Sequence, residues 1–267
     1  MQLLLVQGVG SLLLLLAFVS VAGGTRNPLR VVATAIRKAF ASQGGRRAVF
    51  AVTAVIALNY LEGMADPALG RWLGWDATPL IHDLEGNLVG HLQAATPHAL
   101  VTPLAVFYVP GYLAMLIAPL VIWTAFDQSG VARRYVFAFV LNYLVALPFF
   151  LLAPVNEPAW SGLSTTRPLL ETVWPGISAQ LRAGSPVDNS FPSMHVSCVV
   201  TALWYAHRNG PARLRRLAWV VVPAIVWSTM ALGIHWAADV VAGMFVALGC
   251  CLAVDRRARV DMAGPRR

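Results

Sequence analysis

Two short segments of this chain combine residue types that can carry acid–base and nucleophilic chemistry. The first, residues 188–195, reads Asp-Asn-Ser-Phe-Pro-Ser-Met-His, and the second, residues 233–239, reads Gly-Ile-His-Trp-Ala-Ala-Asp. Each segment lies where a long apolar run begins. Ionisable side chains at membrane depth are costly, so they mark functional sites by default. Two histidines, a carboxylate and a serine at one membrane surface indicate phosphoryl chemistry.

In the second segment, His235 and Asp239 are four residues apart, which places them on one face of a helix. A carboxylate beside an imidazole fixes which ring nitrogen holds the proton and stabilises the cation that forms after attack. The other nitrogen of His235 is then free to attack phosphorus and form a phosphohistidine. We therefore predict that His235 is the nucleophile and that Asp239 orients it.

In the first segment, Pro192 suits the first turn of a helix, and any of residues 188–190 is a candidate N-cap. Ser193 and His195 would then lie in the first turn, where free N–H groups favour anions. We predict that Ser193 binds the substrate phosphate. We expect His195 to protonate the leaving oxygen and then to deprotonate the acceptor, which is worth roughly 10²–10⁴ in rate.

The amino-acid composition indicates which class of protein must position these candidate catalytic residues. Of the 267 residues, 58% are hydrophobic and 12% are charged, whereas soluble domains carry about 25% charge. The chain is therefore an integral membrane protein. The net charge of +8 comes from short basic clusters between apolar runs, which is the positive-inside pattern and not a nucleic-acid surface. We expect the bilayer as a partner and no nucleic acid. Cys198, Cys250 and Cys251 lie in apolar segments and are expected to be buried hydrophobes.

Seven apolar segments come near the length of about 20 helical residues that a bilayer core requires. They are roughly residues 3–23, 48–65, 100–126, 135–153, 193–207, 217–233 and 235–254. Asn59 and Glu62, near one end of the second segment, could face a polar cavity inside the bundle. The predicted fold is an all-α integral membrane protein. We divide it into an N-terminal transmembrane and amphipathic part (1–47), a transmembrane catalytic domain (48–255) and a basic cytoplasmic tail (256–267).

The charges of the connecting segments predict the orientation. With the N-terminus outside, all but three of the 20 Lys and Arg residues fall on the inner side, the exceptions being Arg71, Arg167 and Arg182. Such an asymmetry predicts a cytoplasmic C-terminus and an active site on the extracytoplasmic face of a plasma membrane. The long outer loops, 66–99 and 154–191, would cover that face.

The N-terminal apolar segment is open to two interpretations. Residues 20–22, Ser-Val-Ala, resemble a signal-peptide cleavage site, but no positive region precedes the apolar run, which favours a retained helix. Residues 29–40 repeat apolar side chains at helical spacing, with Arg and Lys elsewhere. This pattern predicts an amphipathic helix on the inner surface, where basic residues meet anionic lipid.

The two motifs resemble those of a known family. Residues 191–195 are similar to the second motif of the type 2 phosphatidic acid phosphatase superfamily, usually P-S-G-H, and residues 228–239 are similar to its third, S-R-x5-H-x3-D. The resemblance covers about residues 100–254. It implies a six-helix core, here with one extra N-terminal transmembrane helix, and it implies no metal or other cofactor. It gives His235, Asp239, His195 and Ser193 the same roles as above.

Three departures from the family motifs bear on the reaction. Met194 replaces the usual Gly, Thr229 stands in place of Arg, and the first motif, K-x6-R-P, is matched only by Arg167-Pro168, with Trp160 at the Lys position. This form is more similar to the branch of inositol phosphorylceramide synthases and sphingomyelin-synthase-like transferases. That resemblance favours transfer to an alcohol. Hydrolysis stays an alternative, because water and alcohol share the first half-reaction.

The remaining outer cations are candidates for the substrate phosphate, because phosphoryl transfer depends mostly on positioning and electrostatics. We predict that Arg167 and Arg182 bind it, with a phospholipid or a polyprenyl phosphate as substrate.

Three other functions compete. Ser193 with His235 would suit a serine protease, although G-x-S-G is absent. His195, His235 and Asp239 would suit a metal centre. A non-catalytic transporter would more often line a path across the membrane with polar residues.

Overall fold

The computed structural model describes the chain over residues 2–182 and 186–263. The long helices are α1 (Gln2–Gly23), α2 (Pro28–Ala41), α3 (Gln43–Leu73), α7 (Tyr112–Ala125), α8 (Ser129–Leu152), α11 (Met194–Asn209), α12 (Ala212–Ala231) and α13 (Ala237–Ala263). The short elements are α4 (Thr78–Glu85), α5 (Leu88–Ala95), η1 (His98–Leu100), α6 (Val101–Val106), η2 (Phe107–Gly111), η3 (Pro158–Trp160), α9 (Leu170–Val173) and α10 (Ile177–Arg182). The described residues form no β-strand, so the predicted all-α class is confirmed.

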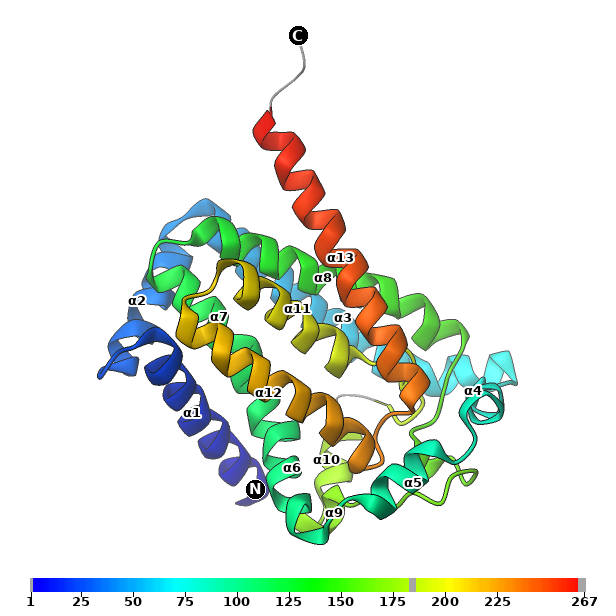
Figure 1. Ribbon diagram of the computed structural model, residues 1–267. Coiled ribbons are helices and arrows are strands. Elements are labelled where there is room, and N and C mark those ends of the chain that lie inside the picture. Colours follow the sequence, from blue (N-terminus) through cyan, green and yellow to red (C-terminus); the bar gives the residue numbers. More distant parts are fainter. Residues whose placement is uncertain (1, 183–185, 264–267) are drawn as a thin grey trace.

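The long helices pack as a bundle, and the short helices α4, α5, α9 and α10 gather at one end of it (Figure 1). A buried aromatic cluster joins three of the long helices. The ring of Trp123 on α7 meets the rings of Tyr135 on α8 and Tyr205 on α11 at centroid distances of 5.4 and 6.4 Å. Edge-to-face pairs of this kind add to the burial of apolar surface. This cluster therefore fixes α11, which carries His195, against its neighbours.

Five stretches of helix are long and apolar enough to cross a membrane. They are Gln43–Ala65, His98–Ala125, Ser129–Leu152, Ala212–Ala231 and Ala237–Val260. These suit a multi-pass membrane protein and match five of the seven predicted segments. The N-terminal pair Gly8–Gly23 and Pro28–Ala41 would provide a sixth, but the two helices are bent by 91°. The crossing of α1 and the total number of spans stay predictions.

The predicted segment 193–207 forms α11, which has only 16 residues. It is shorter than the roughly 20 residues of a full span. Its side chains Val199, Ala202 and Tyr205 are completely buried. α11 therefore lies inside the bundle, surrounded by other helices, and can be short because it need not meet lipid along its whole length.

Residues 29–40 form the predicted amphipathic helix, α2, which turns sharply away from α1. Asn27 caps it by accepting a hydrogen bond from Arg30 N at 3.0 Å. Its apolar side chains Leu29, Ile36 and Phe40 are all more than half exposed. An exposed apolar face beside basic residues is what a helix lying on a lipid surface requires.

Several helices extend past the edges of the apolar runs on which the predicted bounds rested. α8 begins at Ser129 and not at 135, and α12 begins at Ala212 and not at 217. Arginine is a good helix former, so basic residues beside an apolar run continue the helix. The span His98–Ala125 also contains a π-helical turn, η2, around Pro110. Such turns frequently occur at functional sites.

Candidate active site

The turn between α12 and α13 presents His235. Gly233 adopts a left-handed conformation with φ of 80°, which glycine reaches without steric cost. The N–H groups of Ile234 and His235 both donate to the Thr229 carbonyl, at 2.9 and 3.0 Å. Thr229, at the position where the family motif has Arg, therefore fixes the turn through its main chain. α13 begins only at Ala237, so His235 precedes the helix and does not form part of its first turn.

Glu85 of α4 holds the start of α13. Its Oε1 accepts from Ala237 N at 3.1 Å and its Oε2 from Ala238 N at 2.7 Å. A carboxylate at a helix N-terminus satisfies free N–H groups and meets the positive end of the dipole. Burial raises the pKa of Glu85, while the two hydrogen bonds from the main chain oppose that shift. No pattern in the sequence indicates this role of Glu85, since 152 residues separate it from Ala237.

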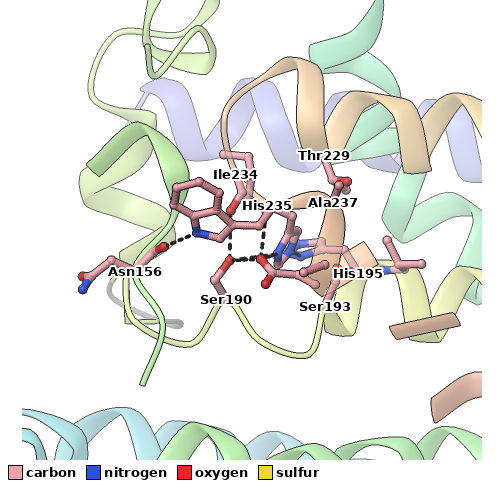
Figure 2. Close-up of polar contacts among 12 residues, drawn as sticks. Asn156, Ser190, Ser193, His195, Thr229, Ile234, His235 and Ala237 are labelled. Carbon is pink, nitrogen blue, oxygen red and sulfur yellow. Dashed lines mark hydrogen bonds and ion pairs between the residues drawn. The ribbon is translucent and has the colours of Figure 1, made fainter. Parts of the chain in front are cut away.

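The two long loops cover this turn, as predicted. The side chain of Gln93 donates to the carbonyls of Arg167 and Ala231, at 2.9 and 3.0 Å. The indole of Trp236 donates to Asn156 O at 2.8 Å, a contact drawn in Figure 2. Ala159 N donates to Gly233 O at 3.1 Å. The loops are therefore hydrogen-bonded to the turn on both sides of His235.

His235, Asp239 and Ser190 form one buried network, and Figure 2 shows Ser190 beside His235. Asp239 Oδ2 lies 3.3 Å from His235 Nδ1 and accepts from Ser190 Oγ at 2.5 Å and from Trp236 N at 2.9 Å. Ser190 Oγ also lies 3.1 Å from His235 Nδ1. A carboxylate is a hydrogen-bond acceptor, so this contact favours the tautomer of His235 with the proton on Nδ1. Nε2 of His235 is left with its lone pair, as a nucleophile needs.

His195 lies directly opposite that lone pair. Its Nδ1 is 3.2 Å from His235 Nε2, and the ring centroids are 5.4 Å apart. The rings of Tyr108 and Tyr112 flank His195, each at 4.8 Å between centroids. Both tyrosines lie at the π-helical turn, which therefore helps to set the orientation of His195. The structure brings the two predicted histidines together.

Ser193 is the N-cap of α11, and it accepts from Val196 N at 3.2 Å. The prediction that one of residues 188–190 caps this helix is therefore wrong. The chain turns between Ser190 and Ser193, which frees Ser190 to contact Asp239. Ser193 is completely buried, and its contact with phosphate stays a prediction. Within residues 2–182 and 186–263, we find no hydrogen bond from Ser193 to His235, the pair that a serine protease would need.

The two arginines that were predicted to bind phosphate differ in their surroundings. Arg167 is exposed, and its main chain is held by Gln93, whose Oε1 accepts from Arg167 N at 2.7 Å. Arg182 is also exposed, and its guanidinium lies 3.9 Å above the ring of Trp160. This is the geometry of a cation–π contact. The structure thus places a cation on the tryptophan that occupies the family's lysine position.

A small cavity of about 60 Å³ lies between the histidines and the surrounding helices. Its lining residues are Asn59, Phe150, Glu157, Asn189, Ser190, Met194, His195, Ile234 and His235. Glu62 lies beside it and accepts from Asn189 Nδ2 at 2.6 Å. The expectation that Asn59 and Glu62 face a polar cavity is confirmed for Asn59, which lines it directly. Neither predicted arginine lines this cavity.

Glu157 is the acidic residue of this cavity lining, and the sequence analysis missed it. Burial raises the pKa of Glu157 to about 8, the charge of Arg182 opposes the shift, and Asp239 adds to it. This shift favours the protonated, neutral carboxyl group near pH 7. No sequence motif contains Glu157. The one feature of the sequence that could have drawn attention to Glu157 is that it is an isolated acidic residue in a long loop, close to Trp160.

The described residues contain no group of three His, Cys, Asp or Glu side chains arranged to hold a metal ion. The three cysteines are free and buried, as predicted.

Comparison with known families gives one match. A family model of the PAP2 superfamily, the type 2 phosphatidic acid phosphatases, matches residues 80–253. The matched stretch includes both histidine segments and begins in α4, earlier than the resemblance read from the motifs. Searches of curated proteins and of solved structures found no match.

Proposed function

Because this chain belongs to the PAP2 superfamily, whose members are generally phosphatases, we propose that it is a membrane enzyme acting on a lipid phosphate ester. In the proposed reaction, His235 attacks phosphorus and the phosphoryl or phospho-headgroup passes from a phosphohistidine to an alcohol. The single observation that carries this proposal is the 3.2 Å approach of His195 Nδ1 to His235 Nε2, with Nδ1 of His235 held by Asp239.

The proton positions support two half-reactions. Nε2 of His235 forms a bond to phosphorus while the bond from phosphorus to the leaving oxygen breaks, and a proton on His195 moves to that oxygen. His235 then carries a positive charge, which Asp239 stabilises at 3.3 Å. In the second half-reaction, His195 takes the proton of the incoming hydroxyl, whose oxygen displaces His235 from phosphorus.

Arg182 is the better supported of the two proposed phosphate ligands. Its contact with Trp160 and the effect of its charge on the pKa of Glu157, which lines the cavity, support this role. The main chain of Arg167 is hydrogen-bonded to Gln93 of α5. We propose that Arg182 supplies a positive charge that the family's first motif takes from lysine.

We prefer transfer to an alcohol over hydrolysis because the F-P-S-x-H and H-x3-D form, with Thr229 in place of Arg, resembles that of the transferase-like branch. Hydrolysis of a lipid phosphate or polyprenyl pyrophosphate is the alternative, since both acceptors would use the same histidines. We further propose that the site faces the extracytoplasmic side of a plasma membrane and that no metal is required.

The test is direct. Purified protein is incubated with a panel of lipid phosphates, with and without alcohol acceptors, in the presence of EDTA, and the products are identified by mass spectrometry. We expect a transferred product whose formation is abolished in His235→Ala and His195→Ala, with unchanged membrane insertion. Wild-type turnover in purified His235→Ala would refute the proposal, and products formed only with water would establish the alternative.

A further inference from the structure

The end of the bundle opposite the histidines carries two apolar grooves that share one arginine. The first, of about 560 Å³, lies between the start of α3 and helices α7 and α8. The second, of about 760 Å³, lies between α8 and α13. Arg133, near the start of α8, lines both. Both volumes fall in the range of ligand sites, about 300–1,000 Å³.

These grooves are separate from the proposed active site. α8 runs between the two ends of the bundle, since the Phe149 ring meets Phe191 at 5.7 Å while Arg134 reaches Asn209 at the far end of α11. A helix rises about 1.5 Å per residue, so Arg133 and Phe149 are about 24 Å apart along α8. A phosphate group bound at Arg133 is therefore too far from the histidines to contact them.

Arg133 differs from the cations beside it. Lys38 Nζ lies 2.7 Å from Asp127 Oδ1, and Arg134 Nε lies 3.8 Å from Asp255 Oδ1, so both have an acidic partner. Within the described residues, the exposed guanidinium of Arg133 has no hydrogen-bond or ion-pair partner. It extends over Gly44, where an added methyl group would lie 2.8 Å from Nη1. An unpaired positive charge is therefore left at the mouth of both grooves.

The walls of the grooves are suited to hydrocarbon. Apolar side chains predominate, and they include Val49, Val52, Leu120 and Val136 in the first groove and Phe137, Val140, Leu141 and Leu144 in the second. A guanidinium forms two parallel hydrogen bonds with a phosphate, which makes arginine suited to bind it. The amphipathic helix α2 borders the first groove through Lys38 and Ala39. The mouth of the grooves is therefore cationic and suits an anion, whereas the walls are apolar and suit acyl chains.

We propose that Arg133 binds the phosphate of an anionic phospholipid, whose two acyl chains lie in the grooves on either side of α8. This lipid is a bound ligand at a second site and is distinct from the substrate. Because it would contact α3, α8 and α13 together, it stabilises the packing of these helices.

The test measures thermal unfolding of the detergent-purified full chain, in a His235→Ala background so that lipid turnover plays no part. We expect phosphatidylglycerol in mixed micelles to raise the unfolding midpoint more than phosphatidylcholine does. Loss of a charge-assisted hydrogen bond should weaken the apparent phosphatidylglycerol affinity about tenfold in Arg133→Gln. The matched control is Arg215→Gln, which removes the same charge from a residue that lines neither groove.

A second variant tests the acyl chains. Leu144→Trp fills part of the second groove, where Leu144 is 48% exposed, and should weaken lipid affinity without altering any charge. The proposal is overturned if Arg133→Gln keeps the affinity of Arg215→Gln, or if phosphatidylcholine stabilises as well as phosphatidylglycerol. It is also overturned if inorganic phosphate alone gives the same Arg133-dependent shift, since the site would then hold a free anion.

Discussion

At the scale of single residues, the network around His235 depends on a hydroxyl group that no motif marks. Ser190 donates to Asp239 at 2.5 Å and contacts His235 Nδ1 at 3.1 Å. A hydrogen bond to a charged group is worth about 1.5–3 kcal/mol. We therefore expect Ser190→Ala to lower kcat about 10- to 100-fold with little change in KM, measured on the lipid substrate. Ser190→Thr keeps the hydroxyl and serves as the control, and unchanged kcat in Ser190→Ala would contradict the role of Ser190.

The raised pKa of Glu157 predicts how activity and stability depend on pH. Its pKa is raised from 4.5 to about 8, chiefly by burial, so it ionises on the alkaline side of neutrality. A carboxylate in the cavity repels an anionic substrate, and we expect turnover to fall as the pH rises through about 8. The alkaline fall should be absent from the pH–rate profile of Glu157→Gln. A profile of Glu157→Gln that matches the wild type would assign the alkaline limb to another group.

The same shift affects folding. A raised pKa means that the folded protein binds the proton more tightly than the unfolded chain does. The stabilisation is therefore fully present below pH 4.5, the ordinary value. It is lost progressively as the pH rises through about 8. Denaturation of Glu157→Gln across this range should show a flatter dependence on pH than the wild type.

At the scale of elements, the distance between the histidines depends on how closely α11 and α13 pack. A methyl group added at Gly243 would lie 2.5 Å from the Ser193 carbonyl oxygen, so the helices would have to separate. A displacement of about 1 Å at a reacting centre can cost about 10² in rate. We expect Gly243→Ala to reduce kcat about 100-fold in a steady-state assay. Gly249→Ala, on the same helix with open space at the site of the methyl group, should keep wild-type activity.

At the scale of the whole molecule, the distribution of charge predicts a single orientation. In intact right-side-out vesicles, an impermeant maleimide should label Leu163→Cys, in the loop beside the candidate site, but not Arg215→Cys at the opposite end. Labelling of Arg215→Cys should appear only after permeabilisation. The native cysteines are buried and should stay unlabelled in both cases. The reverse pattern would place the histidines on the cytoplasmic side.

The sequence alone predicted the features that depend on neighbours along the chain. Apolar runs predicted helices in the right order, and the periodicity of residues 29–40 predicted α2. The spacing of His235 and Asp239 predicted their contact, which the structure confirms at 3.3 Å. Helix periodicity was sufficient for α2. For His235, which precedes α13 and shares no helix face with Asp239, the short separation along the chain was sufficient.

Other parts of the site required the tertiary structure, because they join segments far apart in the chain. Glu85 reaches α13 across 152 residues, and Ser190 reaches Asp239 across 49. Arg182 gains its position from Trp160, and Glu157 gains its shifted pKa from burial. Spacing carries no information about such contacts. Only the packing of the helices and the path of the outer loops decide which polar groups lie close to the histidines.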